Sequence, residues 1–192
     1  MTTFVLATHN AHKVDELRRI LGERLGPHEL IGYDGPEPVE DGDTFEANAL
    51  IKARAAAVVT GLPAIADDSG IAVAALGGAP GIRSARYAGT GDDVDNYRLL
   101  LRNLEGSDDR RADFICVAAL ADGEFEHTER GVWPGEVLTE PTGSGGFGYD
   151  PVFHPDGLLG SSAELSPDAK NAQSHRARAF GQLIVVLRRR YG

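Results

Sequence analysis

Strand-like and helix-like segments alternate through the first part of the chain, and this order constrains the fold more than any other feature. The stretch "TFVLAT" (3–8) is typical of a buried strand. The stretch 10–22 follows it with apolar residues at helical spacing, with Asn10 as the predicted N-cap and Gly22 as the predicted stop. A strand that runs directly into a helix predicts an α/β architecture.

The rest of the chain continues this pattern and then changes it. The expected later elements are a strand in "HELIGY" (28–33), a helix at about 44–60, strands 63–67 and 70–76 on either side of a turn "DDSG", a helix at about 93–104, two strands joined at Asp122-Gly123, and a helix that begins near Ser174. Asp43 and Glu46 resemble a capping box at the start of the second helix. A late hairpin after early alternation predicts one α/β domain over residues 1–192, with a mixed central sheet flanked by helices.

Composition limits the possible functions. The net charge of −10 argues against general nucleic-acid binding, which needs a basic face, and confines any phosphate site to a local basic cluster. No apolar run approaches the length of a membrane span. The start "MTTFVLATHN" lacks the pattern of a secretory signal, and Cys116 has no second cysteine to pair with. We therefore expect a cytoplasmic protein in which Cys116 is a buried thiol.

Four glycines crowd into 143–148 of "TGSGGFGYDPVF", and their spacing satisfies the dinucleotide fingerprint G-x-G-x-x-G. That fingerprint requires a helix that opens at its third glycine. Here Pro151 biases Asp150 towards extended backbone, and the turn "HPDG" follows, so no helix is expected. The segment is better interpreted as a glycine loop with free backbone groups and one aromatic ring, Phe147, which suits a flat polar ligand.

Two stretches at strand ends carry polar residues that a core does not need. In "ATHNAHK" a helix N-terminus and Lys13 suit an anion, although a capped helix with a solvated lysine explains the same residues. In "ADDSG" the adjacent carboxylates of Asp67 and Asp68 require a compensating cation or a turn. Such hard oxygen ligands suit Mg²⁺, and we expect one aspartate to be structural and the other catalytic.

Two further stretches add charge. In "VEDGDTFEANALIKA", Glu40 is a candidate to join the metal, while Glu46 and Asn48 are expected to bond the helix entry and Lys52 shares the face of Asn48. In "SPDAKNAQSHRARAF", His175 and Arg176 fall in the first turn of the last helix, where cations are unfavourable unless an anion is present. An acidic metal site, several cations and a glycine loop together indicate metal-assisted chemistry on a nucleoside polyphosphate.

These motifs, in this order, resemble one family over nearly the whole chain. "FVLATHNAHKVDEL", "DTFEANALIKA", "IADDSGIAVAALGGAPGIRSARYAG", "GSGGFGYDPVF" and "AELSPDAKNAQSHRARA" are similar to the inosine/xanthosine triphosphate pyrophosphatases. The resemblance implies an elongated mixed sheet flanked by helices, two lobes with an active-site cleft between them, and a homodimer. It also implies Mg²⁺-dependent hydrolysis of ITP, dITP and XTP to the monophosphate and pyrophosphate, which cleanses the nucleotide pool.

The resemblance also implies roles for individual residues. Asp68 would be the catalytic carboxylate and a metal ligand, with Glu40 as the second ligand. The residues implied to bind substrate are Thr8, His9, Asn10, Ala11, His12, Lys13, Lys52, Ser69, Phe147, Gly148, Tyr149, Asp150, Lys170, His175 and Arg176. Phe147 would stack on the purine, and Lys52 would face the phosphates. His9 departs from the family, which usually has glycine there, and its side chain either points away or adds a donor.

Two rival functions remain open at this point. One is a pyrophosphatase for modified pyrimidine nucleotides, against which the "FGYDP" and "SHR" motifs argue. The other is a nucleotide-binding regulator without catalysis, which would have no need of both Asp67 and Asp68. Selection of 6-oxopurines is expected to come from backbone N–H and C=O groups in the segment 145–149, because the fold fixes their positions.

Overall fold

A mixed six-stranded sheet, in the order β2-β1-β3-β4-β5-β6, organises the computed structural model, which describes residues 1–192 apart from the side chain of Glu23. The strands are β1 (Thr3–Leu6), β2 (Glu29–Gly32), β3 (Ala64–Val73), β4 (Arg111–Ala121), β5 (Glu126–Val137) and β6 (Phe153–Pro155). β1 pairs in parallel with both β2 and β3, whereas β5 and β6 pair antiparallel. The predicted mixed α/β sheet is confirmed.

The helices begin and end close to the predicted residues. They are α1 (Ala11–Leu21), α2 (Phe45–Thr60), α3 (Asp93–Asn103), α4 (Pro167–Asn171) and α5 (His175–Tyr191), with short 3₁₀ helices η1 (Gly22–Leu25), η2 (Ala74–Leu76), η3 (Gly81–Arg86), η4 (Asp150–Val152) and η5 (Ser162–Glu164). Asn10 caps α1 as predicted, and its side chain accepts a hydrogen bond from the Lys13 N–H at 3.1 Å. The short helix α4 was not predicted. Among the described residues, no helix is both long and apolar enough to cross a membrane.

The predicted cap of α2 is wrong by one residue. Thr44, in extended conformation, is the N-cap, and its hydroxyl accepts from the Ala47 N–H at 3.1 Å. Asp43 therefore lies one position too early to cap this helix. At the other end Gly61 adopts φ 66°, the left-handed conformation that glycine allows, and ends α2.

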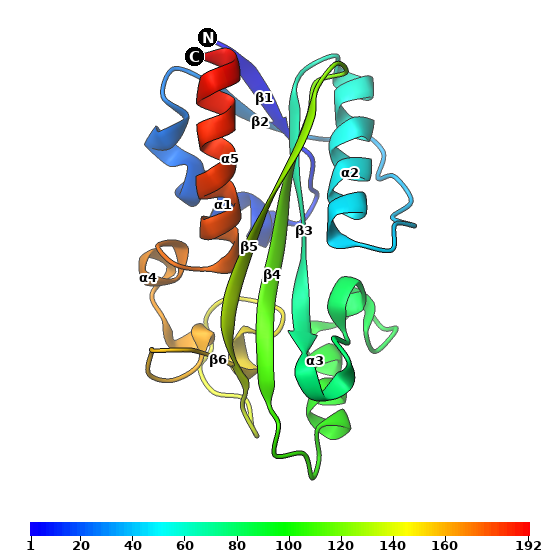
Figure 1. The fold of residues 1–192 in the computed structure, drawn as a ribbon, viewed down its shortest axis with the longest axis vertical. Helices are drawn as coiled ribbons and strands as arrows, with labels where there is room; N and C mark the ends of the chain where they lie inside the picture. Colours follow the sequence, from blue (N-terminus) through cyan, green and yellow to red (C-terminus); the bar gives the residue numbers. More distant parts are fainter. The chain divides into compact units, whose positions relative to one another are not determined.

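The chain groups into two compact units, which we describe separately. Unit 1 comprises Met1–Asp68, Cys116–Gly131 and Arg176–Gly192. Within it α1 and α5 lie on one side of the strands and α2 on the other (Figure 1). Successive side chains of a strand point to opposite faces of the sheet, so one set packs towards α1 and α5 and the other towards α2. Residues Phe4, Leu6, Ile65, Cys116, Ala118 and Leu120 belong to the core that α1 and α5 close.

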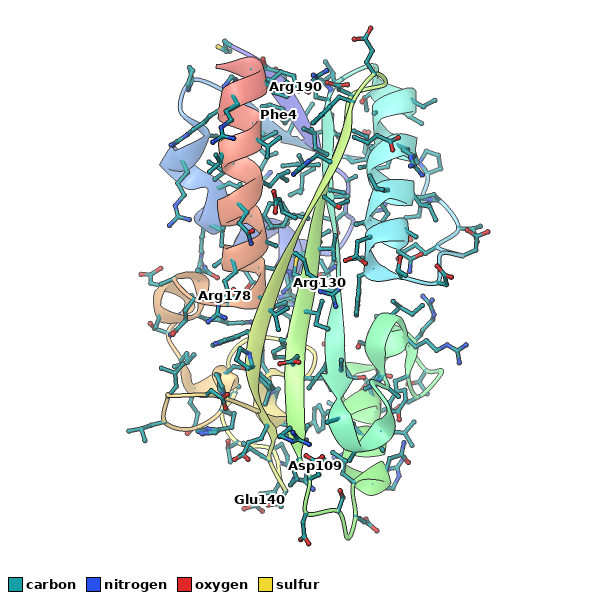
Figure 2. All side chains as sticks on the ribbon, viewed as in Figure 1. Phe4, Asp109, Arg130, Glu140, Arg178 and Arg190 are labelled. Atoms are coloured by element: carbon teal, nitrogen blue, oxygen red, sulfur yellow. The ribbon has the colours of Figure 1, made fainter. Side chains whose placement is uncertain are left out.

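The two ends of the chain lie side by side in unit 1 (Figure 1). The rings of Phe4 and Tyr191 pack edge to face with centroids 5.0 Å apart. Asp122, in the β4–β5 turn, accepts from Arg190 at 2.7 Å and from the Tyr191 hydroxyl at 2.6 Å. Figure 2 shows Phe4 and Arg190 at this end of α5. These contacts fasten the end of α5 to the sheet.

Unit 2 comprises Ser69–Ile115 and Val132–His175 and has its own core. Aromatic residues dominate that core, with the rings of Phe114 and Phe153 4.2 Å apart and Trp133 packed edge-on to Phe153 at 5.7 Å. After the glycine loop the chain forms the three-residue 3₁₀ helix η4 and then the strand β6, so no α-helix opens there. This confirms that the loop is not a dinucleotide fingerprint.

One prediction about the sheet is wrong, and the correction matters for the site. The residues "DDSG" do not form a turn, because β3 runs unbroken from Ala64 to Val73 through them. Position 70 in this strand requires glycine, because a Cβ there would collide with the Gly81 carbonyl oxygen and the side chain of Ser84. Aspartate is a poor strand former, so its presence in β3 must be stabilised by contacts from outside the strand.

Candidate active site

The continuous path of β3 separates the two adjacent aspartates. Side chains alternate along a strand, so Asp67 shares the face of Ile65, which packs under α1 and α5, and Asp68 takes the opposite face, where α2 lies. Asp67 is 1% exposed and Asp68 is 8% exposed. The two carboxylates thus meet different helices and different cations.

Asp67 lies in a buried network of opposite charges. Its Oδ2 is 3.0 Å from Lys13 Nζ of α1 and 3.3 Å from Arg176 Nε of α5. Arg176 Nη1 is in turn 3.0 Å from Glu16 Oε2, also on α1. Two cations therefore face two carboxylates, and the network is neutral. Burial alone would raise the pKa of Asp67, but Lys13 and Arg176 outweigh it and hold that pKa well below its usual range.

Cys116 borders this network. Its Sγ lies 3.9 Å from Asp67 Oδ2, and the side chain is fully buried. Burial, together with the charge of Asp67, raises the pKa of the Cys116 thiol well above its usual value, so the thiol stays protonated. A protonated buried thiol behaves as a small hydrophobic group, as predicted from the sequence.

Replacing Asp67 by asparagine is expected to cost about 3–5 kcal/mol of unfolding free energy, because Lys13 and Arg176 would remain buried without their shared anion. Denaturant unfolding with the slope held in common measures this loss. The matched control is Asp109→Asn, which removes an exposed carboxylate paired with Arg111 and should change stability far less. A change as small in Asp67→Asn as in the control would contradict the structural role of Asp67.

Asp68 belongs to a second cluster, with Lys52 of α2 and Glu40. Lys52 Nζ lies 3.2 Å from Asp68 Oδ1 and 3.1 Å from Glu40 Oε2, so one lysine joins the two carboxylates. Burial lowers the pKa of Lys52, but Asp68, Asp67 and Glu40 outweigh this and raise it, and the ammonium persists. Burial raises the pKa of Asp68, with Lys52 and Lys13 acting against that rise. The lysine and the two carboxylates carry a net charge of −1.

This second cluster fits a magnesium ion. Asp68 Oδ2 is buried and has no hydrogen-bond partner among the described residues. It belongs to the cluster in which two carboxylates face a single lysine, so the cluster has one negative charge in excess. The described residues contain no group of three or more His, Cys, Asp or Glu placed to hold a metal. Mg²⁺ does not require one, since it is usually bound through one or two carboxylates together with substrate phosphates. Asp68 and Glu40 supply that donor set.

The predicted phosphate-binding segment, 8–13, forms the turn into α1. Asn10 caps the helix, and the amide of Ala11, at its first position, makes no hydrogen bond within the described part of the chain. The imidazole of His9 turns to the acidic loop, which we define as residues 37–44, with Nδ1 2.8 Å from Glu37 Oε1 and the ring 5.6 Å from that of Tyr33. The side chain at position 9 is therefore held by Glu37 and Tyr33 of this chain.

Asp150 organises the glycine loop in unit 2. Its carboxylate is 2% exposed and accepts hydrogen bonds from the Phe147 N–H at 2.8 Å, from the Ser162 hydroxyl at 2.8 Å and from Lys170 Nζ at 2.5 Å. Lys170 Nζ also lies 5.0 Å from the centre of the Phe147 ring. The Tyr149 hydroxyl donates to the Ser84 carbonyl at 2.8 Å. Three residues predicted to bind substrate, Phe147, Asp150 and Lys170, are thus joined in one network.

The loop uses most of its own backbone donors. Beyond the Phe147 N–H, the Gly145 N–H donates to the Ala163 carbonyl at 3.0 Å and the Gly148 N–H to Asp93 at 2.8 Å. In the segment 145–149 only the N–H groups of Gly146 and Tyr149 make no hydrogen bond to the described residues. Of the backbone N–H groups predicted to select the base, only those of Gly146 and Tyr149 therefore remain available to a ligand.

The last predicted residues lie at the start of α5. The His175 ring stacks on Phe114 with centroids 4.7 Å apart, and Arg176 is buried in the network around Asp67. The positive charge at this helix N-terminus was expected to indicate a bound anion. The structure gives Arg176 two anions of the protein's own, Asp67 and Glu16, so this charge does not by itself require a ligand. Ser69, the remaining predicted contact, follows Asp68 in β3 and is half-buried.

Comparison with known proteins identifies the family. The model of the Ham1 family matches residues 4–186. The chain belongs to the Ham1 family. A dITP/XTP pyrophosphatase of Leifsonia xyli is 57% identical over 98% of this chain and 96% of its own length. Another Ham1 relative, the dITP/XTP pyrophosphatase of Streptomyces coelicolor, is 49% identical over the full length of both chains.

Solved Ham1 structures share the fold. A HAM1 protein from Coxiella burnetii superposes with a TM-score of 0.89 at 44% identity, covering 98% of this chain and all of the other. A nucleoside-triphosphatase, or dITP/XTP pyrophosphatase, from Mycobacterium abscessus gives a TM-score of 0.76 at 43% identity, with 94% and 98% coverage. The family resemblance predicted from the sequence motifs is confirmed.

Sequence reasoning missed two residues of this Ham1 chain. Glu16, 8% exposed, pairs with Arg176, and a signal was available: this acid is flanked by Leu17 and lies one turn after Lys13 and one turn before Ile20. Asp93, which binds the Gly148 N–H, gave no local signal, because 55 residues separate the two in the sequence.

Proposed function

We infer that this chain is a dITP/XTP pyrophosphatase, which hydrolyses the non-standard purine nucleotides ITP, dITP and XTP to the monophosphate and pyrophosphate. Relatives that are 57% and 49% identical over nearly their whole length carry that name. One structural observation carries the proposal furthest. Lys52 joins the Asp68 and Glu40 carboxylates and leaves a buried Asp68 oxygen without a partner among the described residues.

Asp68 is the catalytic residue in this proposal. It orients the attacking water and accepts its proton, the role of a general base. Lys52 donates a hydrogen bond to Asp68 Oδ1, so that Asp68 Oδ2 remains available for the metal or the attacking water. Asp68 and Glu40 would hold Mg²⁺, which supplies neutralisation of the charge on the phosphate oxygens.

The phosphates are bound by the segment 8–13. The N-terminus of α1, with the free amide of Ala11, offers backbone donors and the positive end of the helix dipole to an anion. Lys13 and Arg176 add positive charge, although both already face Asp67. The water oxygen bonds to the α-phosphorus, the bond from that phosphorus to the bridging oxygen breaks, and these groups stabilise the pyrophosphate that leaves.

The base is bound by the glycine loop. Phe147 stacks on the purine, while Gly148, Tyr149, Asp150, Lys170 and His175 shape the surroundings. Asp150 does this indirectly, because its carboxylate is already shared by the loop, Ser162 and Lys170.

The first product of ITP hydrolysis is expected to be pyrophosphate rather than orthophosphate. The reason is that the N-terminus of α1, together with a magnesium ion held by Asp68 and Glu40, would bind the whole triphosphate and not its γ-phosphate alone. Phosphorus NMR of ITP with Mg²⁺ distinguishes the two products directly. Orthophosphate as the initial product would overturn the proposed cleavage, and binding of ITP without any product would favour a non-catalytic nucleotide-binding protein.

Further properties of the family remain predictions for this chain. We propose one catalytic domain over residues 1–192, a homodimer and a cytoplasmic location. An active-site cleft between two lobes is also proposed on the basis of the family resemblance. Sedimentation at micromolar concentration tests the dimer.

A further inference from the structure

Asn48 is a buried amide that the proposed chemistry does not use. It lies on α2, is 1% exposed, and its side-chain Oδ1 accepts a hydrogen bond from the Gly42 N–H at 2.9 Å. Gly42 follows the proposed metal ligand Glu40 by two residues. The side chain therefore ties the backbone of the acidic loop to α2.

The loop is also packed against α2 too closely for a side chain at Gly42. A Cβ there would lie 2.6 Å from Asn48 Oδ1 and 2.7 Å from Ala47 Cβ. Gly42 is not among the glycines with positive φ, so close approach, not backbone conformation, requires glycine at this position. Hydrogen bonding and shape fix the same point of the loop.

Lys52 lies one helical turn beyond Asn48 on α2 and holds the loop at a second point, through Glu40 Oε2 at 3.1 Å. Asn48 Nδ2 is buried and makes no hydrogen bond to any described residue, although its Oδ1 is engaged. A buried amide nitrogen without a hydrogen-bond partner lowers the free energy of unfolding, because it has lost its bonds to water without replacing them. This cost to stability indicates that Asn48 has a role in the site beyond packing.

We propose that Asn48 is a positioning residue for Glu40: it fixes the backbone at Gly42 so that the Glu40 carboxylate is held beside Asp68 before a metal arrives. The proposal rests on the proposed function in taking Glu40 as a metal ligand. Side chains that orient metal ligands typically contribute about 10–100-fold to metal affinity. Asn48 acts through Glu40 and does not contact the reacting atoms.

The test compares Asn48→Ala with Asn96→Ala. Asn96 is an equally buried amide of unit 2, 1% exposed, that also ties backbone, accepting from the Ala88 N–H and donating to the Ala85 carbonyl. Both variants lose a buried amide that is hydrogen-bonded to backbone, so Asn96→Ala controls for the loss of stability that such a change causes. Only Asn48→Ala should free the acidic loop.

Three measurements follow. In metal-free protein, hydrogen exchange of the segment 37–44 should accelerate about tenfold or more in Asn48→Ala and stay unchanged in Asn96→Ala. Binding of Mn²⁺, followed by its electron paramagnetic resonance signal, should weaken about 10–100-fold only in Asn48→Ala. The Mg²⁺ concentration for half-maximal ITP hydrolysis should rise by a similar factor, while kcat at saturating Mg²⁺ stays within a few-fold of wild type.

The outcomes separate this proposal from the proposed function. If the wild type does not hydrolyse ITP, the function fails, but exchange and Mn²⁺ binding still test Asn48. If Asn48→Ala does not fold, Gly42→Ala keeps the asparagine at position 48 but displaces the loop, because the added Cβ would lie 2.6 Å from Asn48 Oδ1, and it should give the same three changes. Unchanged exchange and Mn²⁺ binding in the folded variant would overturn the proposal, as would equal changes in Asn96→Ala.

Discussion

Replacing Asp68 by asparagine is expected to lower kcat for ITP by about 10²–10⁴-fold, because the amide cannot accept the proton of the attacking water. Weakened metal binding should add to this loss, since the amide lacks the negative charge of the carboxylate. The fold should survive, because asparagine keeps the size of the side chain and Oδ1 can still accept from Lys52. Pyrophosphate release at saturating Mg²⁺, with thermal melting alongside, measures both effects.

Asp67→Asn provides the contrast for this experiment. The two substitutions are chemically identical and adjacent in β3, yet one faces Lys13 and Arg176 and the other faces Lys52. Asp68→Asn should lower the rate with little change in stability, and Asp67→Asn should lower stability substantially. An Asp68→Asn variant within a few-fold of wild-type activity would contradict the assignment of Asp68 as the catalytic base.

The second large effect is discrimination against ATP, where we expect kcat/KM about 10⁴-fold below that for ITP. Hypoxanthine presents an acceptor at O6 and a donor at N1, whereas adenine presents a donor and an acceptor at those positions. The loop is fixed and cannot rotate to suit adenine, because hydrogen bonds within the protein already engage the N–H groups of Gly145, Phe147 and Gly148. Each buried polar group left unpaired would cost about 1–3 kcal/mol.

GTP should be the better of the two common purine substrates, because guanine shares O6 and N1–H with hypoxanthine and differs by its 2-amino group. The control is Phe147→Ala, which removes stacking worth about 1–3 kcal/mol regardless of base identity. It should therefore weaken ITP and ATP alike and preserve their ratio. Values of kcat/KM for ITP, XTP, GTP and ATP on both proteins test this, and ATP turned over as readily as ITP would refute selection by the loop.

The sequence predicted most of the local structure. Apolar periodicity located β1, α1, α2, α3 and the β4–β5 hairpin, and residue type identified Asn10 as a helix cap and Gly22 as a stop. These features depend on residues within a few positions of one another, so they can be derived without the fold. The motifs along the chain were also sufficient to indicate the Ham1 family.

The sequence failed where distant residues override local preference. Two aspartates, a serine and a glycine favour a turn by themselves, yet β3 continues through them, with Lys13 and Arg176 neutralising Asp67 and Lys52 pairing with Asp68. No local pattern contains that information, because these cations come from three different helices.

The amino-acid sequence alone thus determined the α/β elements, the family and the set of residues able to carry the chemistry. Only the tertiary structure decided how the paired aspartates divide their roles. Because β3 is continuous, its alternation directs Asp67 to the helices α1 and α5 and Asp68 to α2. The structure also decided which donors of the glycine loop remain, since Asp93 and Asp150 occupy two of them. Partners far apart in the chain meet only when the sheet and helices pack.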